Sequence, residues 1–127
     1  MQTTQAPKEL EVFGQLQRNL GEATVQLIAT AVRTPWKELS LEMRTSPDGT
    51  SRGMKLRVTP VSGALIAVRP TRAVEVALHN ICEMRSTFTA PWYGMKLTIT
   101  SQGQCKVEFN YEPECKKEPA FRDSQEF

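Results

Sequence analysis

One histidine and three cysteines are the residues of this chain whose types suit nucleophilic, acid–base or metal chemistry. They are His79, Cys82, Cys105 and Cys115. The His-x-x-Cys spacing of the first two puts them on one face of a helix, where they would supply two zinc ligands. A structural zinc site needs four ligands, and the other two cysteines are ten residues apart rather than in a tight pair. We therefore predict a partly buried helix face here, with no metal site and no cofactor.

A cysteine-dependent enzyme is the alternative that these residues leave open. It would need Cys105 or Cys115 beside His79, because a nucleophilic thiol is activated by a neighbouring base. Neither cysteine lies in a recognisable nucleophile motif, and the sequence has no glycine-rich phosphate loop and no Gly-x-Ser-x-Gly elbow. Cys105 also alternates onto the apolar face of a predicted strand. We predict that the protein is not an enzyme and that Cys→Ala substitutions leave its function intact.

Composition places the chain in an ordinary class. Its 127 residues suit one domain, and 16 basic against 14 acidic residues give a net charge of +2, which is small for a protein that binds a phosphate backbone. Three cysteines without tight pairs fit a reducing compartment. No apolar run approaches 18 residues, and residues 1–5 lack the basic flank and apolar run of a signal peptide. We expect a cytoplasmic protein without a membrane segment.

The hydrophobic pattern predicts the elements that position the polar residues. Apolar residues at three- and four-residue spacing from Leu10 to Ile28 indicate a helix over Pro7–Arg33. From Trp36 the period changes to two, and turn residues separate three short strands. These strands are expected at Lys37–Arg44, Met54–Val58 and Ala64–Val68.

A second helix and two further strands are predicted in the second half. Thr71 is a plausible N-cap for a helix of roughly 18 residues that ends before Pro91. Strands are expected at Tyr93–Thr100 and Cys105–Tyr111. The sequence becomes charged and aperiodic after Pro113, so we predict one domain over residues 1–112 and a loose charged tail over residues 113–127.

The order is therefore helix, three strands, helix, two strands, or αβββαββ. It predicts an α+β fold: a two-layer sandwich in which an antiparallel sheet of about five strands carries two helices on one face. The other face is expected to be polar, with these residues on it: Glu38, Ser40, Glu42, Arg44, Lys55, Arg57, Thr59, Lys96, Thr98, Thr100, Lys106, Glu108, Asn110 and Glu112.

Three interpretations of this polar face are open. It is a solvated surface with cross-strand ion pairs, a mixed-charge docking surface for a protein, or a nucleic-acid surface. Four glutamates interleave with the basic residues and would repel phosphate, and there is no exposed aromatic platform, so direct nucleic-acid binding is disfavoured. Charge is also uneven along the chain: residues 36–69 hold six bases and three acids, whereas residues 100–127 hold four bases and six acids. Opposite poles favour a directional contact with a protein.

The last two predicted strands have a specific pattern. Ala90-Pro91-Trp92-Tyr93 leads into one strand, Gly103 lies in the turn, and Lys106 to Glu112 form a strand that contains Phe109-Asn110-Tyr111. This pattern resembles the hairpin of the YezG-like immunity proteins, in which a Trp opens a strand and the second strand ends in a Phe-acid-Tyr run. The layout of residues 8–112 is also similar to that family. Asn110 stands where the family usually has an acid, which argues against electrostatic mimicry of nucleic acid.

The resemblance implies a function. Such proteins are antitoxins that bind the toxic C-terminal domain of a polymorphic bacterial toxin, often a nuclease, delivered by a secretion or contact-dependent system. We expect a monomer in a one-to-one complex with such a domain, without direct contact to nucleic acid or membrane. The alternative is a non-inhibitory adaptor or chaperone that binds a secreted protein. Trp36 and Trp92 are expected to be core plugs at the ends of strands. The residues predicted to bind the partner are Glu42, Arg44, Arg57, Glu108, Tyr111 and Glu112.

Overall fold

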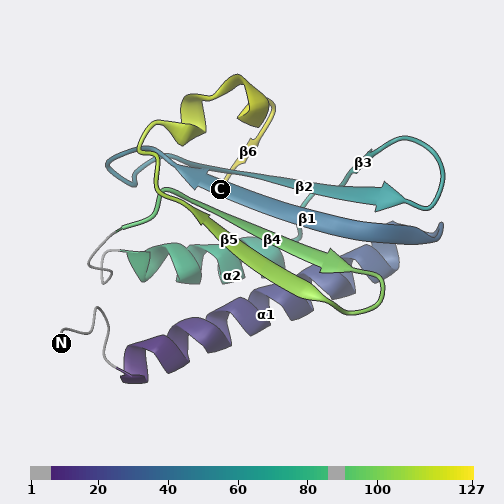
Figure 1. The fold of residues 1–127 in the computed structure, drawn as a ribbon, viewed down its shortest axis with the longest axis horizontal. Helices are drawn as coiled ribbons and strands as arrows, with labels where there is room; N and C mark the ends of the chain where they lie inside the picture. Colours follow the sequence, from purple (N-terminus) through teal and green to yellow (C-terminus); the bar gives the residue numbers. More distant parts are fainter. Residues whose placement is uncertain (1–6, 86–90) are drawn as a thin grey trace.

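The structure is a computed structural model, and it describes residues 7–85 and 91–127 (Figure 1). It confirms the α+β fold and the order αβββαββ, and it adds two 3-10 turns and a sixth strand at the C-terminus. The elements are α1 (Pro7–Ala31), β1 (Trp36–Thr45), β2 (Arg52–Pro60), β3 (Ile66–Ala67), α2 (Arg72–Glu83), β4 (Gly94–Thr100), β5 (Cys105–Asn110), η2 (Cys115–Lys117), η3 (Pro119–Phe121) and β6 (Gln125–Glu126).

One antiparallel sheet organises the molecule. Its strands follow the order β3-β2-β1-β4-β5, and β6 pairs with β2. Both helices lie against the same face, which gives two layers (Figure 1). We call the opposite face of the sheet the outer face. No helix in the described part of the chain combines the length and hydropathy needed to cross a membrane.

Helix α1 buries one stripe of its surface. Phe13, Leu20 and Ile28 lie on this stripe and are buried, as the spacing predicts. Leu10 is 52% exposed, so its predicted place in the core is wrong; it lies in the first turn, ahead of the part of the helix that the sheet covers. Thr24 is fully buried on the stripe, and its hydroxyl donates to the Leu20 carbonyl oxygen at 2.7 Å, which satisfies a polar group in the core.

Helix α2 begins as predicted and ends earlier. The Thr71 hydroxyl caps it by accepting a hydrogen bond from the Val74 N–H at 3.4 Å. The helix ends at Glu83, so the prediction of roughly 18 residues is wrong at Met84 and Arg85. Residues 86–90, which that prediction also covered, lie outside the described residues.

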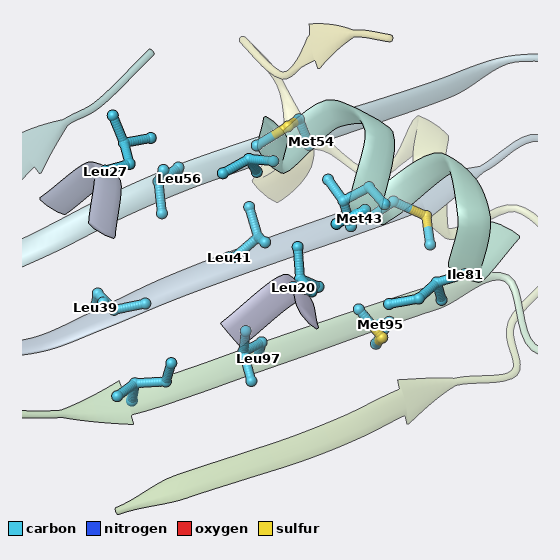
Figure 2. Packing of buried hydrophobic residues seen from close by; sticks show 14 of the residues in the cluster. Leu20, Leu27, Leu39, Leu41, Met43, Met54, Leu56, Ile81, Met95 and Leu97 are labelled. Carbon is cyan, nitrogen blue, oxygen red and sulfur yellow. The ribbon is translucent and has the colours of Figure 1, made fainter. Parts of the chain in front are cut away.

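The core fills the space between the helices and the sheet. Alternating residues of β1, β2 and β4 point toward the helices, among them Leu41, Leu56 and Leu97 (Figure 2). Trp92 is buried just before β4, with its ring 5.5 Å from that of Phe109, centroid to centroid, which confirms it as a core plug. Trp36 is half-buried against the same core.

Residues 113–127 are packed onto the sheet, and the prediction of a loose tail is wrong. Cys115 and Phe121 are buried, and β6 adds to the sheet by pairing Gly53 with Glu126 and Met54 with Gln125. The segment crosses the outer face at one end of the sheet, as Figure 1 shows in yellow. We call residues 113–127 the C-terminal strap. Its two buried apolar side chains, Cys115 and Phe121, are too widely spaced to give a periodic signal in the sequence.

Candidate functional site

The register of the strands arranges the outer face in rows that run across the sheet. Glu42 of β1 lies opposite Lys55 of β2 on one side and Lys96 of β4 on the other, and Lys96 lies opposite Glu108 of β5. We call Lys55, Glu42, Lys96 and Glu108 the charged row. Its signs alternate, so every cross-strand neighbour is an opposite charge.

A groove lies over the β1, β4 and β5 end of the charged row. Its volume is about 370 Å³. Tyr111 is 58% exposed at the groove, which makes it the largest exposed aromatic side chain among the described residues. The Asn110 side-chain oxygen accepts a hydrogen bond from the Glu112 N–H at 2.9 Å, which fixes the chain just after β5. The groove is lined by Glu42, Met95, Lys96, Glu108, Phe109, Asn110 and Tyr111.

The charges on the β5 side of this groove are open to solvent. The Glu108 carboxylate lies 3.6 Å from the Lys106 ammonium, and both side chains are more than half exposed. Exposed ion pairs of this kind contribute at most about 1 kcal/mol to stability. These groups are therefore held only weakly by the protein itself, and they remain available to an incoming partner.

Arg44 lies one row further along β1, and it has the opposite environment. It is only 8% exposed. Its guanidinium donates two hydrogen bonds to Glu42 at 2.8 and 3.0 Å, and it donates to the Cys115 carbonyl oxygen and to the Glu118 carboxylate, each at 2.6 Å. Burial by itself lowers the pKa of Arg44, but the hydrogen bonds and charges of the two glutamates outweigh it and raise that pKa. Arg44 is therefore fully paired inside the molecule.

The C-terminal strap is what covers Arg44. The Phe121 ring centroid lies 4.9 Å from the Arg44 guanidinium and 5.8 Å from the Lys55 ammonium, which also donates to the Ala120 carbonyl oxygen at 3.0 Å. The acidic C-terminal part is thus folded back onto the basic strands. The two charge poles seen in the sequence partly neutralise each other within one chain, so they are a weaker sign of a partner than the sequence indicates.

Of the six residues predicted to bind a partner, the groove brings together three, Glu42, Glu108 and Tyr111. Arg44 is buried under the strap. Arg57 is half-buried outside the groove and donates to the Leu56 carbonyl oxygen at 3.2 Å. The sixth, Glu112, is exposed and follows the groove residues without lining the groove.

Lys96 and Asn110 line the groove and were not among the predicted binding residues. The sequence places both on the outer face but carries no sign of which neighbours they meet. The strand register identifies them, because it places Lys96 between Glu42 and Glu108 and places Asn110 opposite Gly94.

The histidine and cysteines do not assemble into a reactive group. The His79 Nδ1 atom lies 3.2 Å from an Arg52 guanidinium nitrogen, on the helix side of the sheet. Cys115 lies on the opposite side, and its thiol donates to the Tyr93 carbonyl oxygen at 3.5 Å. Burial raises the pKa of Cys115, and it does the same for Cys82, so both thiols are poor sources of thiolate at neutral pH.

Cys105 differs from the other two cysteines. It points toward the helix side, as its place in the alternation predicts, but it is exposed because β5 is the last strand of the sheet. In residues 7–85 and 91–127, no group of three or more His, Cys, Asp or Glu side chains is placed to hold a metal ion.

Comparison with known proteins gives no independent assignment. No family model matches this sequence, and no curated protein matches it either. The resemblance of residues 90–112 to the YezG-like hairpin therefore stays a prediction from the sequence.

Proposed function

We propose that the protein is an immunity protein that binds and neutralises the toxic C-terminal domain of a cognate bacterial toxin in the cytoplasm. The observation that carries the proposal is the groove on the outer face, where an exposed Tyr111 adjoins the charged row. Most of the groove lining comes from the hairpin whose sequence pattern resembles that of the YezG-like proteins, and the groove contains three of the six residues predicted to bind a partner.

The chemistry of this groove suits a folded protein as the partner. Tyr is one of the side chains that most often anchor protein interfaces, because it buries a large rigid surface and keeps a polar hydroxyl. Lys96 beside Glu108 offers both signs of charge within one row. Such a pattern selects a complementary surface and repels a uniformly charged polymer, so it favours a protein over a phosphate backbone.

The rest of the fold supports inhibition by a rigid surface. The groove rests on three strands whose other sides are packed against the helices, and the strap ties down the adjacent end of the sheet. Little conformational entropy is then lost when a partner binds, which favours tight association. Protection from a toxin requires nanomolar affinity, or about −12 kcal/mol.

The test is an activity assay with the toxin domain encoded beside this gene. We expect the purified protein to form a one-to-one complex with that domain and to abolish its activity at equimolar concentration. Cells that carry the toxin gene should survive only when this chain is expressed with it. The matched control is Lys117→Ala, which removes an exposed lysine of the strap that does not line the groove; this variant should protect as well as the natural chain.

Three outcomes separate the possible functions. Binding with loss of toxin activity supports the proposal. Binding without loss of activity contradicts it and supports a non-inhibitory adaptor or chaperone. If the two proteins do not bind, the proposed function is wrong.

A further inference from the structure

Strand β5 leaves one edge of the sheet open. The other edge is protected, because β2 carries the short strands β3 and β6 along its outer side. In the described part of the chain, β5 pairs with β4 and with no other strand, and it is the outermost ribbon on its side of the sheet in Figure 1. An open edge presents unpaired N–H and C=O groups, which pair readily with another strand.

The pairing with β4 determines which backbone groups point outward. The Thr100 N–H donates to the Gln104 carbonyl oxygen at 2.9 Å where the β4–β5 hairpin closes. Hydrogen-bonded and non-hydrogen-bonded pairs alternate along an antiparallel ladder. Lys106 and Glu108 therefore direct their backbone groups toward β4, whereas Cys105, Val107 and Phe109 direct theirs to the open edge.

The side chains on the outer face of this edge carry opposite charges. Lys106 is 70% exposed and Glu108 is 52% exposed, and they are two residues apart. A second copy of the chain can pair with this edge antiparallel about a two-fold axis perpendicular to the sheet. Such an axis leaves the outer faces of both copies on the same side of the joined sheet. Residues that lie opposite each other must then be an even number of positions apart in the sequence. One residue of β5 therefore lies opposite itself, and we call this residue the centre of the register.

The centre can lie on Lys106, Val107 or Glu108 in the middle of β5, and the charges favour one of these three registers. A centre on Lys106 sets that lysine against itself, and a centre on Glu108 does the same for the glutamate. A centre on Val107 sets Lys106 of each copy opposite Glu108 of the other, in the closely spaced pairs of the ladder. In this register the outward N–H and C=O groups of Val107 also bond to the C=O and N–H groups of Val107 in the other copy.

We propose that two copies of this chain associate through β5 in the register centred on Val107, which joins the two sheets into one continuous sheet. The charged row then extends across the junction, because Lys106 of the second copy follows Glu108. On the helix side, Phe109 of the second copy lies opposite Cys105. Cys105 borders an apolar hollow of about 500 Å³ with Gly21, Val25 and Ile99, which the second copy would cover.

This association does not depend on the proposed function. Because the two-fold axis is perpendicular to the sheet, the grooves of both copies open on the same face. A toxin-bound form would then contain two copies of each protein, in place of the single copy that the sequence predicts.

Charge reversal and mixing test the proposal. In Lys106→Glu, both β5 pairs become Glu against Glu, and in Glu108→Lys both become Lys against Lys. We expect the natural chain to sediment as a dimer and each variant to associate at least about tenfold more weakly. An equimolar mixture of the two variants should again form a dimer, because every pair is then a Lys opposite a Glu. Lys117→Glu reverses an exposed lysine away from β5 and should leave the dimer unchanged.

The mixing result separates the contact between copies from effects within one chain. Each variant also loses the Lys106–Glu108 pair inside its own strand, and mixing cannot restore that pair. Recovery of the dimer in the mixture supports the proposal. It is overturned if the natural chain sediments as a monomer at every concentration, if the variants stay dimeric, or if the mixture stays monomeric.

Disulfide cross-linking tests the register. In the proposed pairing the two Val107 Cα atoms are about 5.5 Å apart, within the range of a disulfide. Two Cys105 residues are about 14 Å apart, since each lies four residues from the point opposite the other. On mild oxidation, we expect Val107→Cys in a Cys105→Ser background to form a cross-linked dimer and the natural Cys105 to form none. Cross-linking through Cys105 instead would overturn the register.

Discussion

Arg44 and Lys96 project from neighbouring strands onto the same face of one sheet, and they lie in adjacent rows. Arg44 is buried, with four hydrogen bonds to Glu42, Glu118 and the Cys115 carbonyl oxygen. Lys96 is exposed at the rim of the groove. Nothing in the local pattern of either strand distinguishes them, since both are basic residues in a strict alternation.

The C-terminal strap is what separates the two rows. It covers the row that contains Arg44, and it reaches the charged row only at the β2 end, where Lys55 donates to the Ala120 carbonyl oxygen. The covered row is part of the protein's own packing, so its substitutions should change stability. The open row is the part of the charged row at Lys96 and Glu108, which are exposed and contribute little to stability, so their substitutions should change binding. The first three of the following predictions test this division, and the fourth concerns a turn outside both rows.

The largest effect is expected at Phe121, the buried anchor of the strap. Phe121→Ala removes an aromatic side chain that is 1% exposed, and we expect it to lower the free energy of unfolding by about 3–5 kcal/mol. Tyr111→Ala, at the exposed groove, should change it by no more than about 0.5 kcal/mol. Urea unfolding followed by circular dichroism measures both. Equal losses in the two variants would contradict the division between the rows.

The next largest effect is expected at Arg44 itself. Arg44→Met keeps most of the side-chain volume but leaves Glu42, Glu118 and a buried carbonyl oxygen without their donor. We expect a loss of about 2–3 kcal/mol, because groups that lose a charged partner in a buried site are costly. Lys96→Met is the matched change on the open row and should cost less than about 0.5 kcal/mol. A small loss at Arg44 would contradict the division between the rows.

A smaller effect is expected where the strap passes over Gly53. A Cβ atom at this position would lie 2.6 Å from the Ser124 hydroxyl oxygen and 3.2 Å from the Ser124 Cβ. Gly53→Ala should therefore cost about 1–3 kcal/mol and speed hydrogen exchange in residues 113–127. Adding Ser124→Gly removes both clashing atoms and should restore much of the protection. If the double variant exchanges as fast as Gly53→Ala, the close approach is not the cause.

The smallest effect concerns Asp48, in the turn between β1 and β2, which belongs to neither row. Hydrogen bonds from Ser46 and Thr50 lower its pKa from 3.8 to about 2. The folded pKa lies below the unfolded value, so this contribution to stability is present above about pH 4 and disappears as the pH falls toward 2. Asp48→Asn should flatten the fall of the urea midpoint over this interval. An unchanged slope would show that the carboxylate is not held by these bonds.

The sequence was sufficient for the order of the elements from α1 to β5 and for the faces of β1, but not for the end of α2 or for the elements of the strap. Alternation at Leu39, Leu41 and Met43 and the Thr71 cap are local signals, and the structure confirms them. The environment of Arg44 was not predictable in this way, because its partner Glu118 is 74 residues away. One clue was present: a glycine inside a strand, Gly53, often marks the close approach of another segment.

The residues of the groove were only partly predictable, because contacts between strands bring some of them together. The sequence predicted Glu42 of β1 and, three residues apart at the end of the hairpin, Glu108 and Tyr111. Lys96 becomes their neighbour only through the pairing of β4 with β5, and the sequence does not state that register. The sequence therefore indicated the local chemistry of each strand, but it did not predict which residues of neighbouring strands are in contact.

The central claim is that the open row, and not the covered one, binds the partner. The most direct test is the affinity of the toxin domain encoded beside this gene for the natural chain and for the double variant Lys96→Ala/Tyr111→Ala, which leaves Lys106 and Glu108 of β5 unchanged. Calorimetric titration should show that the double variant binds at least about thirtyfold more weakly, since anchor residues contribute about 2 kcal/mol or more, while its urea midpoint is unchanged. Equal affinity in the two proteins would contradict the account.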